Sequence, residues 1–534
     1  MLTFATSPTI TRNLNPIVPL AAIITFEASD PVETTLAIDD GLNQWELFYG
    51  ADKSPAAGLP VVGMRPDTTL TIRVTIQHGE QQVTHPVALT FVAPSLPTDP
   101  ALFPTLRIDA SQPKRMEPGL TLVFARRRSA GEPTELSPEQ RKFMMTYGLI
   151  IALNARGAVV WYFVAHARIA DMIQLRNGNF AYITTECDLT EVDVLGNTVQ
   201  QWYAQDRVQG PHATATPISG IETIHHCIHE LSNGNFLAFT ASKQIVENYY
   251  TSEFDPAAPR KTQPVMGDTI IEFSRSGEVV WCWNSFDHLD PYRMGYEGLY
   301  SYWWVRGFPG HMDWTHGNSL WIDEAANTVL LCLRNQEAIF NIDRATGDIL
   351  WILGEHTDWP AHLQPKLLQP IGEIQWPYHM HTPSMTQDGR FLVFDNGVFG
   401  ARPFTMPKRP AETFGRAAEY QIDEANMTVA EVWASEQKGD PDNLLSFAMG
   451  DADRLPQTGN VLISYGFCFP PEEVRELEPT EYNRCTHRSS KARVREVTHA
   501  SPPETVFDVR VINDTPGATF GWACFGAEKI RRLI

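Results

Sequence analysis

Two kinds of hairpin recur along the chain and constrain its fold more than any other feature of the sequence. In the first, a short strand leads through an Asn-Gly, Asp-Gly or Thr-Gly turn into a second strand. Its copies are IADMIQLRNGNFAYIT (169–184), HHCIHELSNGNFLAFT (225–240), HMHTPSMTQDGRFLVF (379–394) and DADRLPQTGNVLIS (451–464). These turn residues tolerate positive φ angles, so each copy is predicted to form an antiparallel hairpin.

The second kind of hairpin ends on tryptophan. Its copies are LNARGAVVW, VDVLGNTVQQW, FSRSGEVVW, IDRATGDILW and IDEANMTVAEVW, which end at Trp161, Trp202, Trp281, Trp351 and Trp433. Two hairpins per repeat give a four-stranded antiparallel sheet, and a series of such sheets indicates a β-propeller. With ARVREVTHASPPETVFDV (492–509) as the last copy, six blades are predicted, and seven or eight are the alternatives. The strand GLTLVFARR (119–127) is expected to close the ring with the C-terminal blade.

The first 105 residues follow a different pattern. Short strands such as TTLAIDD and TLTIRVTIQ alternate between apolar and polar residues, as in a small β-sandwich of immunoglobulin type. The Pro-rich stretch VAPSLPTDPALFP reads as a linker. The expected fold class is therefore all-β, with an N-terminal sandwich and linker over 1–105 and a propeller over 106–534. SPEQRKFMM (137–145) is the best candidate for a helix.

Charge and composition exclude several classes of partner. The formal net charge is −21 and no basic block occurs, which argues against nucleic acid. No apolar run approaches the roughly 20 residues that a membrane-spanning helix needs, so no membrane is expected. As given, the N-terminus lacks the basic and apolar regions of a signal peptide, so the chain is expected to be either a processed form or a cytoplasmic protein. The seven cysteines are dispersed without a CxxC motif; a Cys468–Cys485 pair is left open, with free thiols favoured.

Histidines gather at the starts of the predicted innermost strands. Seven of the sixteen lie in three equivalent segments: His225, His226, His229, His311, His316, His379 and His381. Innermost strands line the central channel of a propeller, where ligands bind. A single histidine at a strand start is usually a core residue bonded to the backbone, but three segments together favour a site. His379 and His381 point to one side of a strand and could bind zinc, yet no third ligand is evident, so no metal is predicted.

Longer motifs resemble one enzyme family. The stretch DWTHGNSLWIDEAANTVLLCLRNQEAIFNIDRATGDILWILGEH (313–356) is similar to the core signature of the bacterial PAPS-independent arylsulfate sulfotransferases. HTPSMTQDGRFLVFDNG (381–397) and GRAAEYQIDEANMTVAEVW (415–433) resemble the following two blades. The resemblance covers nearly the whole chain. It implies transfer of a sulfuryl group from one phenol to another through a sulfohistidine, and it implies a mostly periplasmic family.

The resemblance also implies catalytic residues. His316 matches the histidine of the DW-H-NS motif, His381 the histidine ahead of FDNG, and Arg416 the arginine of R-A-EY. His487 in CTHRSSKARVREV fits best as the covalent nucleophile, with His499 as the fallback.

Sulfuryl transfer resembles phosphoryl transfer, which depends mainly on positioning and on stabilising charge on the peripheral oxygens. A guanidinium can clamp two such oxygens, histidines can donate to the oxygens or to the departing phenolate, and a neutral histidine can attack sulfur. We therefore expect Arg416 to bind the group, His316 and His381 to stabilise it, and His487 to form the covalent bond. His311 and Asp313 are expected to support the site or the local structure.

Trp303 and Trp304 in YSYWWVRGFPG are candidates for an aromatic wall that binds phenols, although core positions in an inserted loop fit equally well. His225 and Asn396 are further candidates for substrate contacts; His225 could instead line the channel without chemistry, and the position of Asn396 in FDNG also suits a turn.

The leading hypothesis is a ping-pong aryl-sulfate sulfotransferase that needs no cofactor and no PAPS. Its expected partners are small aryl sulfates and phenols, and a homodimer is left open. Three alternatives remain: an aryl sulfate hydrolase on the same scaffold, a metal- or quinone-dependent oxidoreductase propeller, and a non-catalytic binding propeller.

Overall fold

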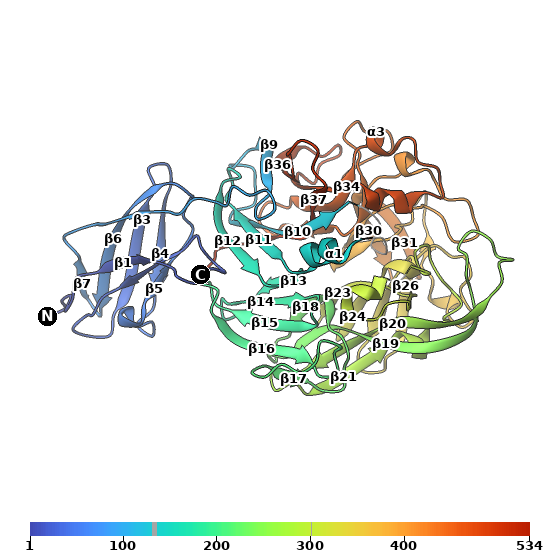
Figure 1. Ribbon diagram of the computed structural model, residues 1–534, viewed down its shortest axis with the longest axis horizontal. Coiled ribbons are helices and arrows are strands. Elements are labelled where there is room, and N and C mark those ends of the chain that lie inside the picture. The colour runs from blue at the N-terminus through green and yellow to red at the C-terminus, as the bar shows by residue number, and fades with distance from the viewer. Residues whose placement is uncertain (131–135, 301) are drawn as a thin grey trace.

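β-Strands are the dominant secondary structure of the chain, as predicted (Figure 1). The computed structural model describes residues 1–130, 136–300 and 302–534, except for the side chain of His487. No helix in these ranges is long and apolar enough to cross a membrane.

The N-terminal residues form two antiparallel sheets. The first contains β1 (Thr9–Arg12), β2 (Ala22–Thr25) and β5 (Leu59–Val61); the second contains β3 (Glu33–Asp39), β4 (Gln44–Tyr49), β6 (Thr69–His78), β7 (Gln81–Thr84) and β8 (Leu89–Val92). Buried and exposed positions alternate strictly along β6, where Leu70, Ile72, Val74 and Ile76 enter the core. The alternating apolar pattern of this segment therefore produces one buried and one solvated face.

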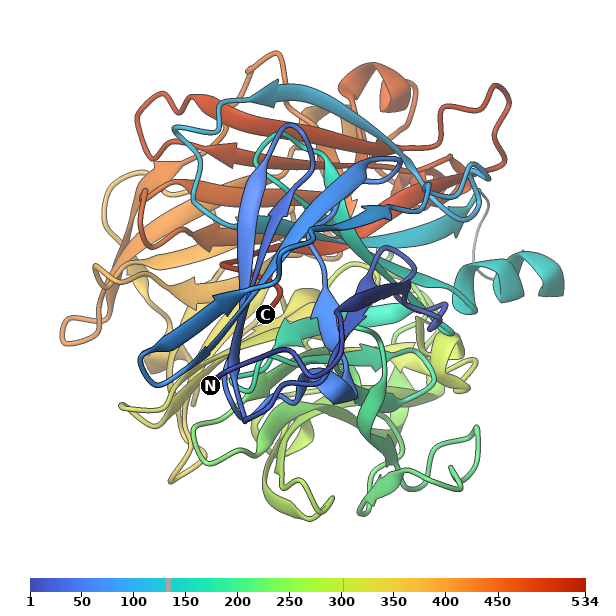
Figure 2. The same cartoon turned by 90° about the vertical axis from the view of Figure 1, so that its left-hand side faces the viewer.

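Six further sheets make up the larger part of the molecule (Figures 1 and 2). The first contains β10 (Leu120–Ser129), β11 (Gly148–Leu153), β12 (Val159–Ala165) and β37 (Phe520–Ile530). The second contains β13 (Ile169–Gln174), β14 (Phe180–Thr184), β15 (Asp188–Val192), β16 (Thr198–Ala204) and β17 (Thr216–Ile218). The third contains β18 (His225–Glu230), β19 (Phe236–Tyr249), β20 (Lys261–Phe273), β21 (Val279–Asn284) and β22 (Met312–Asp313).

The fourth sheet contains β23 (Gly317–Asp323), β24 (Thr328–Leu333), β25 (Ala338–Asp343) and β26 (Ile349–Gly354). The fifth contains β27 (Gln369–Pro370), β28 (His381–Met385), β29 (Phe391–Asp395), β30 (Arg416–Asp423) and β31 (Thr428–Ala434). The sixth contains β9 (Thr105–Ser111), β32 (Leu445–Ala448), β33 (Asp451–Arg454), β34 (Val461–Phe469), β35 (Lys491–Val497) and β36 (Thr505–Ile512). The succession of sheets is propeller-like, and their number equals the predicted number of blades.

The predicted hairpins are the building units of these sheets. Each of the four segments with a Gly-containing turn forms the first hairpin of a sheet, and each Trp-terminated segment forms the second. The strand predicted to close the ring does so, because β10 pairs with the C-terminal strand β37 from Leu120↔Ile530 to Ser129↔Phe520. A second closure joins β9 to β36.

The recurring tryptophans link each sheet to the next. The indole N–H of Trp161 donates to Val194 O in the following sheet, at 3.1 Å. The same bond recurs from Trp202 to Arg275 O, from Trp281 to Arg344 O and from Trp433 to Ala500 O, all at 2.9 Å, while Trp351 donates to the Glu424 side chain at 2.7 Å. Every acceptor lies in the turn between the third and fourth strands of the next sheet, so the spacing of the tryptophans follows from the contact between neighbouring sheets.

Short helices and loops complete the fold. α1 (Pro138–Met145) lies where a helix was predicted and begins with a capping box, because the side chains of Ser137 and Gln140 each bond to the other's backbone N–H. The remaining helical segments are α2 (Ser285–His288), α3 (Pro471–Val474) and the 3-10 turns η1 (Pro55–Ala57), η2 (Tyr302–Arg306), η3 (Arg334–Gln336), η4 (Gln364–Lys366), η5 (Pro410–Glu412) and η6 (Tyr482–His487).

The N-terminal domain packs against the start of the larger one (Figure 1). Asn13 Nδ2 donates to Leu195 O at 3.0 Å, and Val164 N donates to Ile17 O at 2.8 Å. One cluster of buried side chains also contains residues from both domains, including Leu36 and Val123. The two domains therefore share part of a hydrophobic core.

The sheet-to-sheet bonds predict a graded effect on stability. Trp161→Phe keeps most of the buried area but loses the bond to Val194 O, and should lower the free energy of unfolding by about 1–2 kcal/mol. Trp161→Ala also leaves a cavity and should cost about 3–5 kcal/mol. Urea midpoints would measure both. Val199→Ala, at a position that is 55% exposed on β16, is the control and should shift the midpoint by less than about 0.5 kcal/mol. Equal midpoints for Trp161→Phe and the unaltered protein would argue against a role for the bond.

Candidate active site

Three innermost strands begin with a β-bulge, and these bulges carry the clustered histidines. The pairing register shifts between His225 and Ile228, between Gly317 and Ser319, and between His381 and Ser384. His226 (φ 60°) and His316 (φ 48°) have left-handed backbones, an uncommon conformation for residues other than glycine. Bulges re-aim side chains at the rims of barrels and beside active sites. Here they bring histidines of different sheets into one cavity.

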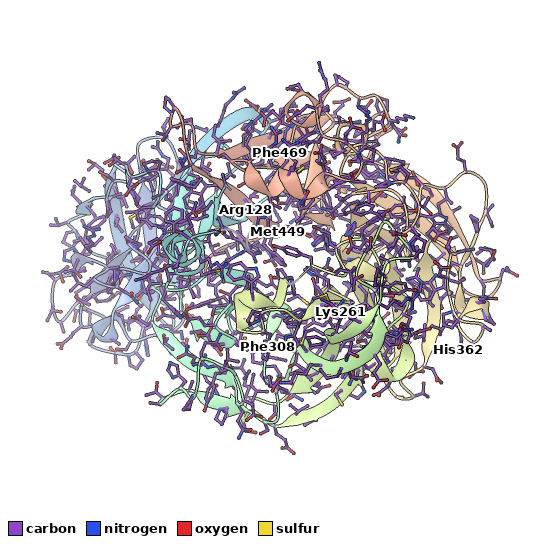
Figure 3. The ribbon with its side chains drawn as sticks, turned by 45° about the vertical axis from the view of Figure 1, so that its right-hand side comes forward. Arg128, Lys261, Phe308, His362, Met449 and Phe469 are labelled. Carbon is purple, nitrogen blue, oxygen red and sulfur yellow. The ribbon has the colours of Figure 1, made fainter. Side chains whose placement is uncertain are left out.

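The cavity has a volume of about 130 Å³ and lies at the centre of the ring of sheets. Its wall includes His226, His316, His381 and Arg334, together with Arg126, Arg128, Arg168, Glu297, Tyr302, Trp304, Asp313 and Phe525. Figure 3 labels two residues of this wall, Arg128 and Met449. Residues from all six sheets or their connecting loops contribute to it.

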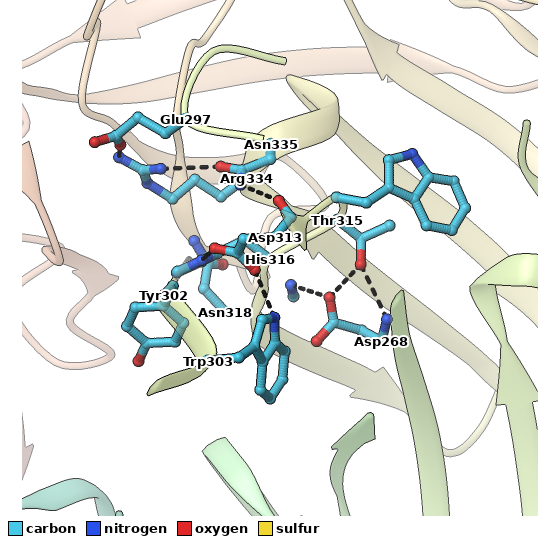
Figure 4. A network of polar contacts seen from close by, with 12 residues as sticks. Asp268, Glu297, Tyr302, Trp303, Asp313, Thr315, His316, Asn318, Arg334 and Asn335 are labelled. Carbon is cyan, nitrogen blue, oxygen red and sulfur yellow. Dashed lines mark hydrogen bonds and ion pairs between the residues drawn. The ribbon is translucent and has the colours of Figure 1, made fainter. Parts of the chain in front are cut away.

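The wall is cationic although the whole chain is strongly acidic. Four arginines line it, whereas its two carboxylates, Glu297 and Asp313, are both paired with cationic side chains. Glu297 Oε2 accepts from Arg334 Nη2 at 2.5 Å, and Arg334 Nη1 donates to Asn335 Oδ1 at 2.9 Å (Figure 4). A guanidinium has five N–H donors, so these contacts leave donors for a bound anion. A small cavity with this surplus of positive charge is suited to an anionic group.

The neighbouring Asp313 carboxylate favours the charged form of His316. Its Nδ1 lies 2.5 Å from Asp313 Oδ2, and the other oxygen of Asp313 accepts from Trp303 Nε1 at 2.9 Å (Figure 4). Burial opposes protonation, but the Asp313 carboxylate outweighs it and raises the pKa of His316 above its usual value. His316 therefore presents an Nε2–H donor and a positive charge to the cavity.

His381 is held in the opposite state. Asn396 Nδ2 donates to Ser446 O (2.9 Å) and to Met449 O (2.8 Å), so its side-chain oxygen must face His381 Nδ1, 2.8 Å away. An amide oxygen only accepts, which places the proton of His381 on Nδ1 and a lone pair on Nε2. Burial, and next the charge of Arg334, lower the pKa of His381 to about 3. The ring is thus a neutral imidazole with a defined tautomer, as a nitrogen nucleophile requires.

Arg416 lies outside this wall. It begins β30 but is only 2% exposed, and its guanidinium forms ion pairs with Asp395 (Nε–Oδ2, 3.1 Å) and Glu431 (Nη1–Oε1, 2.6 Å). A third bond joins Nη2 to Gln375 O at 3.0 Å. The donors of Arg416 therefore face protein oxygens and not the cavity, and its part in binding the sulfuryl group stays a prediction.

The predicted substrate-binding residues divide into two groups. Trp304 lines the cavity, as expected. Trp303, His225 and Asn396 are buried behind its wall, where they contact Asp313, His226 and His381 respectively. Their placement therefore fits the support of neighbouring side chains and not contact with a substrate.

The segment of the predicted nucleophile reaches the rim of the cavity. His487 is the last residue of η6, and Asn483 and Thr486 of the same segment line the wall. The side chain of His487 lies outside the described part of the structure, so its role stays a prediction. His499, the fallback, lies away from the wall and pairs with Glu419 at 2.7 Å.

Cys468 is a buried thiol that donates to Lys491 O, not a partner in a disulfide with Cys485.

Sequence reasoning missed two functional candidates. Arg334 stands in the LRNQEAI part of the motif that suggested the family. One hairpin separates it from His316, and this spacing was the sequence signal that the two residues lie close together. Tyr302 stands directly before the two tryptophans in YSYWWVRGFPG, and nothing in that stretch distinguishes it from an aromatic wall.

A second chamber adjoins the cavity. It has a volume of about 360 Å³ and shares Glu297, Tyr300 and Asn483 with the cavity. Its other lining residues are Thr251, Ser252, Glu253, Phe254, Leu299, Phe399, Thr480 and Tyr482. The cavity therefore has room for the anionic group of a ligand, and the adjoining chamber has room for the rest of it.

Comparison with known proteins identifies the family. The arylsulfotransferase (ASST) family model matches residues 107–507, which is most of the chain. The chain belongs to the arylsulfotransferase family. The predicted resemblance is thereby confirmed.

Individual relatives match a smaller part. The arylsulfate sulfotransferases AssT of Lelliottia amnigena and of Escherichia coli O6:H1 are each 27% identical over 207 residues, which is 31% of this chain and 34% of theirs. The match thus spans about a third of the length of these relatives.

Solved structures are similar only at a coarse level. A Bacteroides caccae protein of unknown function is 11% identical, with a TM-score of 0.39, over 78% of this chain and 99% of that one. The WD40 β-propeller domain of Doa1 is 9% identical, with a TM-score of 0.28, over 74% and 86%. These scores are too low to support an argument about the site.

The Asp313–His316 pair predicts a measurable titration change. In Asp313→Asn the carboxylate is gone while burial remains, so the pKa of His316 should fall below its usual value and the imidazole should be neutral near pH 7. Histidine ring signals followed by NMR across pH 4–9 would report it. Asp171→Asn removes a carboxylate that makes no ion pair with His316 and serves as the control. An unchanged His316 titration in Asp313→Asn would contradict the assignment.

Proposed function

We propose that this protein transfers a sulfuryl group from an aryl sulfate to a phenol through a sulfohistidine, without PAPS. The observation that carries the proposal is the neutral His381 with its lone pair on Nε2, in a cavity walled by arginines. Family membership supports the reaction class.

The cavity can bind the sulfuryl group by charge and by hydrogen bonds. An aryl sulfate carries one negative charge spread over three oxygens. Arg334 offers a planar fork of donors to two oxygens, and the charged His316 offers Nε2–H to another. Both cations are fixed in place by Glu297 and Asp313 before the substrate arrives, which is the preorganisation that stabilises a transferring anionic group.

In the first half-reaction, His381 Nε2 attacks sulfur. The N–S bond forms while the bond from sulfur to the aryl oxygen breaks, and its electron pair leaves on the phenolate. Asn396 continues to accept from Nδ1–H and so stabilises the charge on the modified ring. In the second half-reaction a phenol oxygen attacks sulfur and the N–S electron pair returns to Nε2, which gives ping-pong kinetics.

We propose His381 as the nucleophile in place of His487. The support is geometric, since the tautomer and charge of His381 are set by Asn396, Arg334 and burial. The aryl ring of the donor would extend into the chamber that shares Glu297, Tyr300 and Asn483, because the cavity itself is below the roughly 300–1,000 Å³ of sites that enclose drug-sized ligands.

The topology also supports the finer reading of the fold. We infer that the six sheets are the blades of a six-bladed β-propeller, because each joins two hairpins and because β37 and β9 close the ring at both ends of the domain. The N-terminal pair of sheets fits a sandwich of immunoglobulin type.

The decisive experiment uses 4-nitrophenyl sulfate as the donor, with and without phenol as the acceptor. A transferase should release nitrophenol in an acceptor-dependent manner and accumulate a sulfuryl adduct when phenol is omitted. Mass spectrometry should place the adduct on the peptide containing His381, and His381→Ala should abolish it. An adduct on His487 would identify His487 as the nucleophile in place of His381 and would leave the ping-pong mechanism unchanged. Release that does not depend on phenol would favour the hydrolase, and no release would contradict both.

Arg334 and Arg416 give opposite predictions. Arg334→Ala should lower kcat about 10²–10³-fold, the range found when one donor to a developing charge is removed. Arg416→Met should instead lower the thermal midpoint, because it leaves Asp395 and Glu431 without their partner, while the folded fraction keeps kcat within about threefold of the unaltered protein. Steady-state kinetics on the folded fraction and thermal melts would distinguish the two. A large loss of kcat in Arg416→Met alone would restore the original prediction.

A further inference from the structure

Tyr302 is a polar side chain of the cavity wall that has no part in binding or attack as described above. Tyr302 begins η2, and its ring lies over His316, with centroids 4.6 Å apart, and beside His226 at 5.8 Å. Its hydroxyl accepts from Arg306 Nη1 at 3.1 Å and lies 3.4 Å from His226 Nε2. Tyr302 is therefore part of the cavity wall, with its ring beside His316 (Figure 4).

A row of buried groups lies behind this hydroxyl. His226 Nδ1 is 2.7 Å from His225 Nδ1, and His225 Nε2 is 3.4 Å from Asp268 Oδ1. Burial lowers the pKa of both histidines well below the usual value, followed by Arg306 for His225 and by His225 itself for His226. The Asp268 carboxylate beside Nε2 of His225 favours a proton on that nitrogen, which leaves His226 to donate through Nδ1 and to keep a lone pair on Nε2. That lone pair accepts from the Tyr302 hydroxyl and fixes its position.

The surrounding charges favour ionisation of this phenol. Burial alone would raise the pKa of Tyr302, but Arg306, His316 and Arg168 outweigh burial and lower it to about 8. An ordinary phenol has a pKa of about 10. A group of this acidity can give a proton to a departing phenolate and take one from an attacking phenol near neutral pH.

We propose that Tyr302 is the acid–base group of the transfer reaction. The proposal rests on the proposed function. In the first half-reaction the Tyr302 O–H turns from His226 to the aryl oxygen and gives it the proton as the bond from that oxygen to sulfur breaks, which leaves a Tyr302 phenolate held by Arg306. In the second half-reaction the phenolate takes the proton of the acceptor phenol as that oxygen bonds to sulfur. One proton leaves and one returns, so Tyr302 ends in its starting form.

His316 is less suited to this task. Its charge is stabilised by Asp313 and is needed on the sulfuryl oxygens in both half-reactions, and loss of its proton would remove the partner of a buried carboxylate. His226, His225 and Asp268 act through Tyr302 and are positioning residues.

The test compares the rates of adduct formation from two aryl sulfate donors in Tyr302→Phe, a variant that keeps the aromatic ring and loses the hydroxyl. The nitro group of 4-nitrophenyl sulfate makes its phenolate a good leaving group that needs no proton, so formation of the adduct should change by less than about threefold. With 4-methylphenyl sulfate the departing oxygen needs a proton, and the rate should fall at least about 10²-fold, the usual contribution of general acid catalysis. Rapid-quench measurement of the adduct in single turnovers gives both rates.

Tyr300→Phe is the matched control, because it removes another hydroxyl from the same wall. It should affect both donors equally. Equal rates for Tyr302→Phe and the unaltered protein, or an equal fall with both donors, would overturn the role of Tyr302 while leaving the transferase intact. No nitrophenol release by the unaltered protein would overturn the proposed function itself, and the role of Tyr302 with it.

Discussion

The bond from each recurring tryptophan to the next sheet is the contact on which the rest of the structure depends. An antiparallel sheet of two hairpins cannot bury both of its faces alone, so it must pack against neighbours. The indoles of Trp161, Trp202, Trp281 and Trp433 each fix the turn of the following sheet at nearly the same distance. The pairing of β10 with β37 then closes the series, and a central cavity results whose wall comes from residues far apart in sequence.

Burial gives this cavity its chemistry, because a desolvated ionisable group takes the state that its partner allows. Asp313 keeps His316 charged, Asn396 keeps the proton of His381 on Nδ1, and Glu297 holds Arg334. The two histidines thereby take different protonation states, and the arginine is fixed in place. The arrangement also explains how a chain with a net charge of −21 can receive an anion, since the positive charges concentrate where water is excluded.

Much of the fold could be predicted from local patterns. Gly-containing turns, alternating strands and terminal tryptophans located nine hairpins, and the stretch SPEQRKFMM located the helix α1. The site was predictable only in part. His316 and His381 stood out because histidines gather at strand starts, whereas Arg334 and Tyr302 lie in loops with no periodic signal. Arg416 stands in a motif that resembles the family, but the carboxylates of Asp395 and Glu431 neutralise its charge. That pairing depends on contacts between neighbouring strands, which the sequence does not show.

The sequence by itself determined the all-β architecture, its repeat unit and its family, because these depend on spacing and on residue types that act over a few positions. Only the tertiary structure decided which side chains share the cavity and in which protonation state. Bulges at the strand starts turn His226, His316 and His381 toward a common centre, and contacts across sheets set the charge of each. Proton positions depend on partners brought together by folding, and no local pattern encodes those partners.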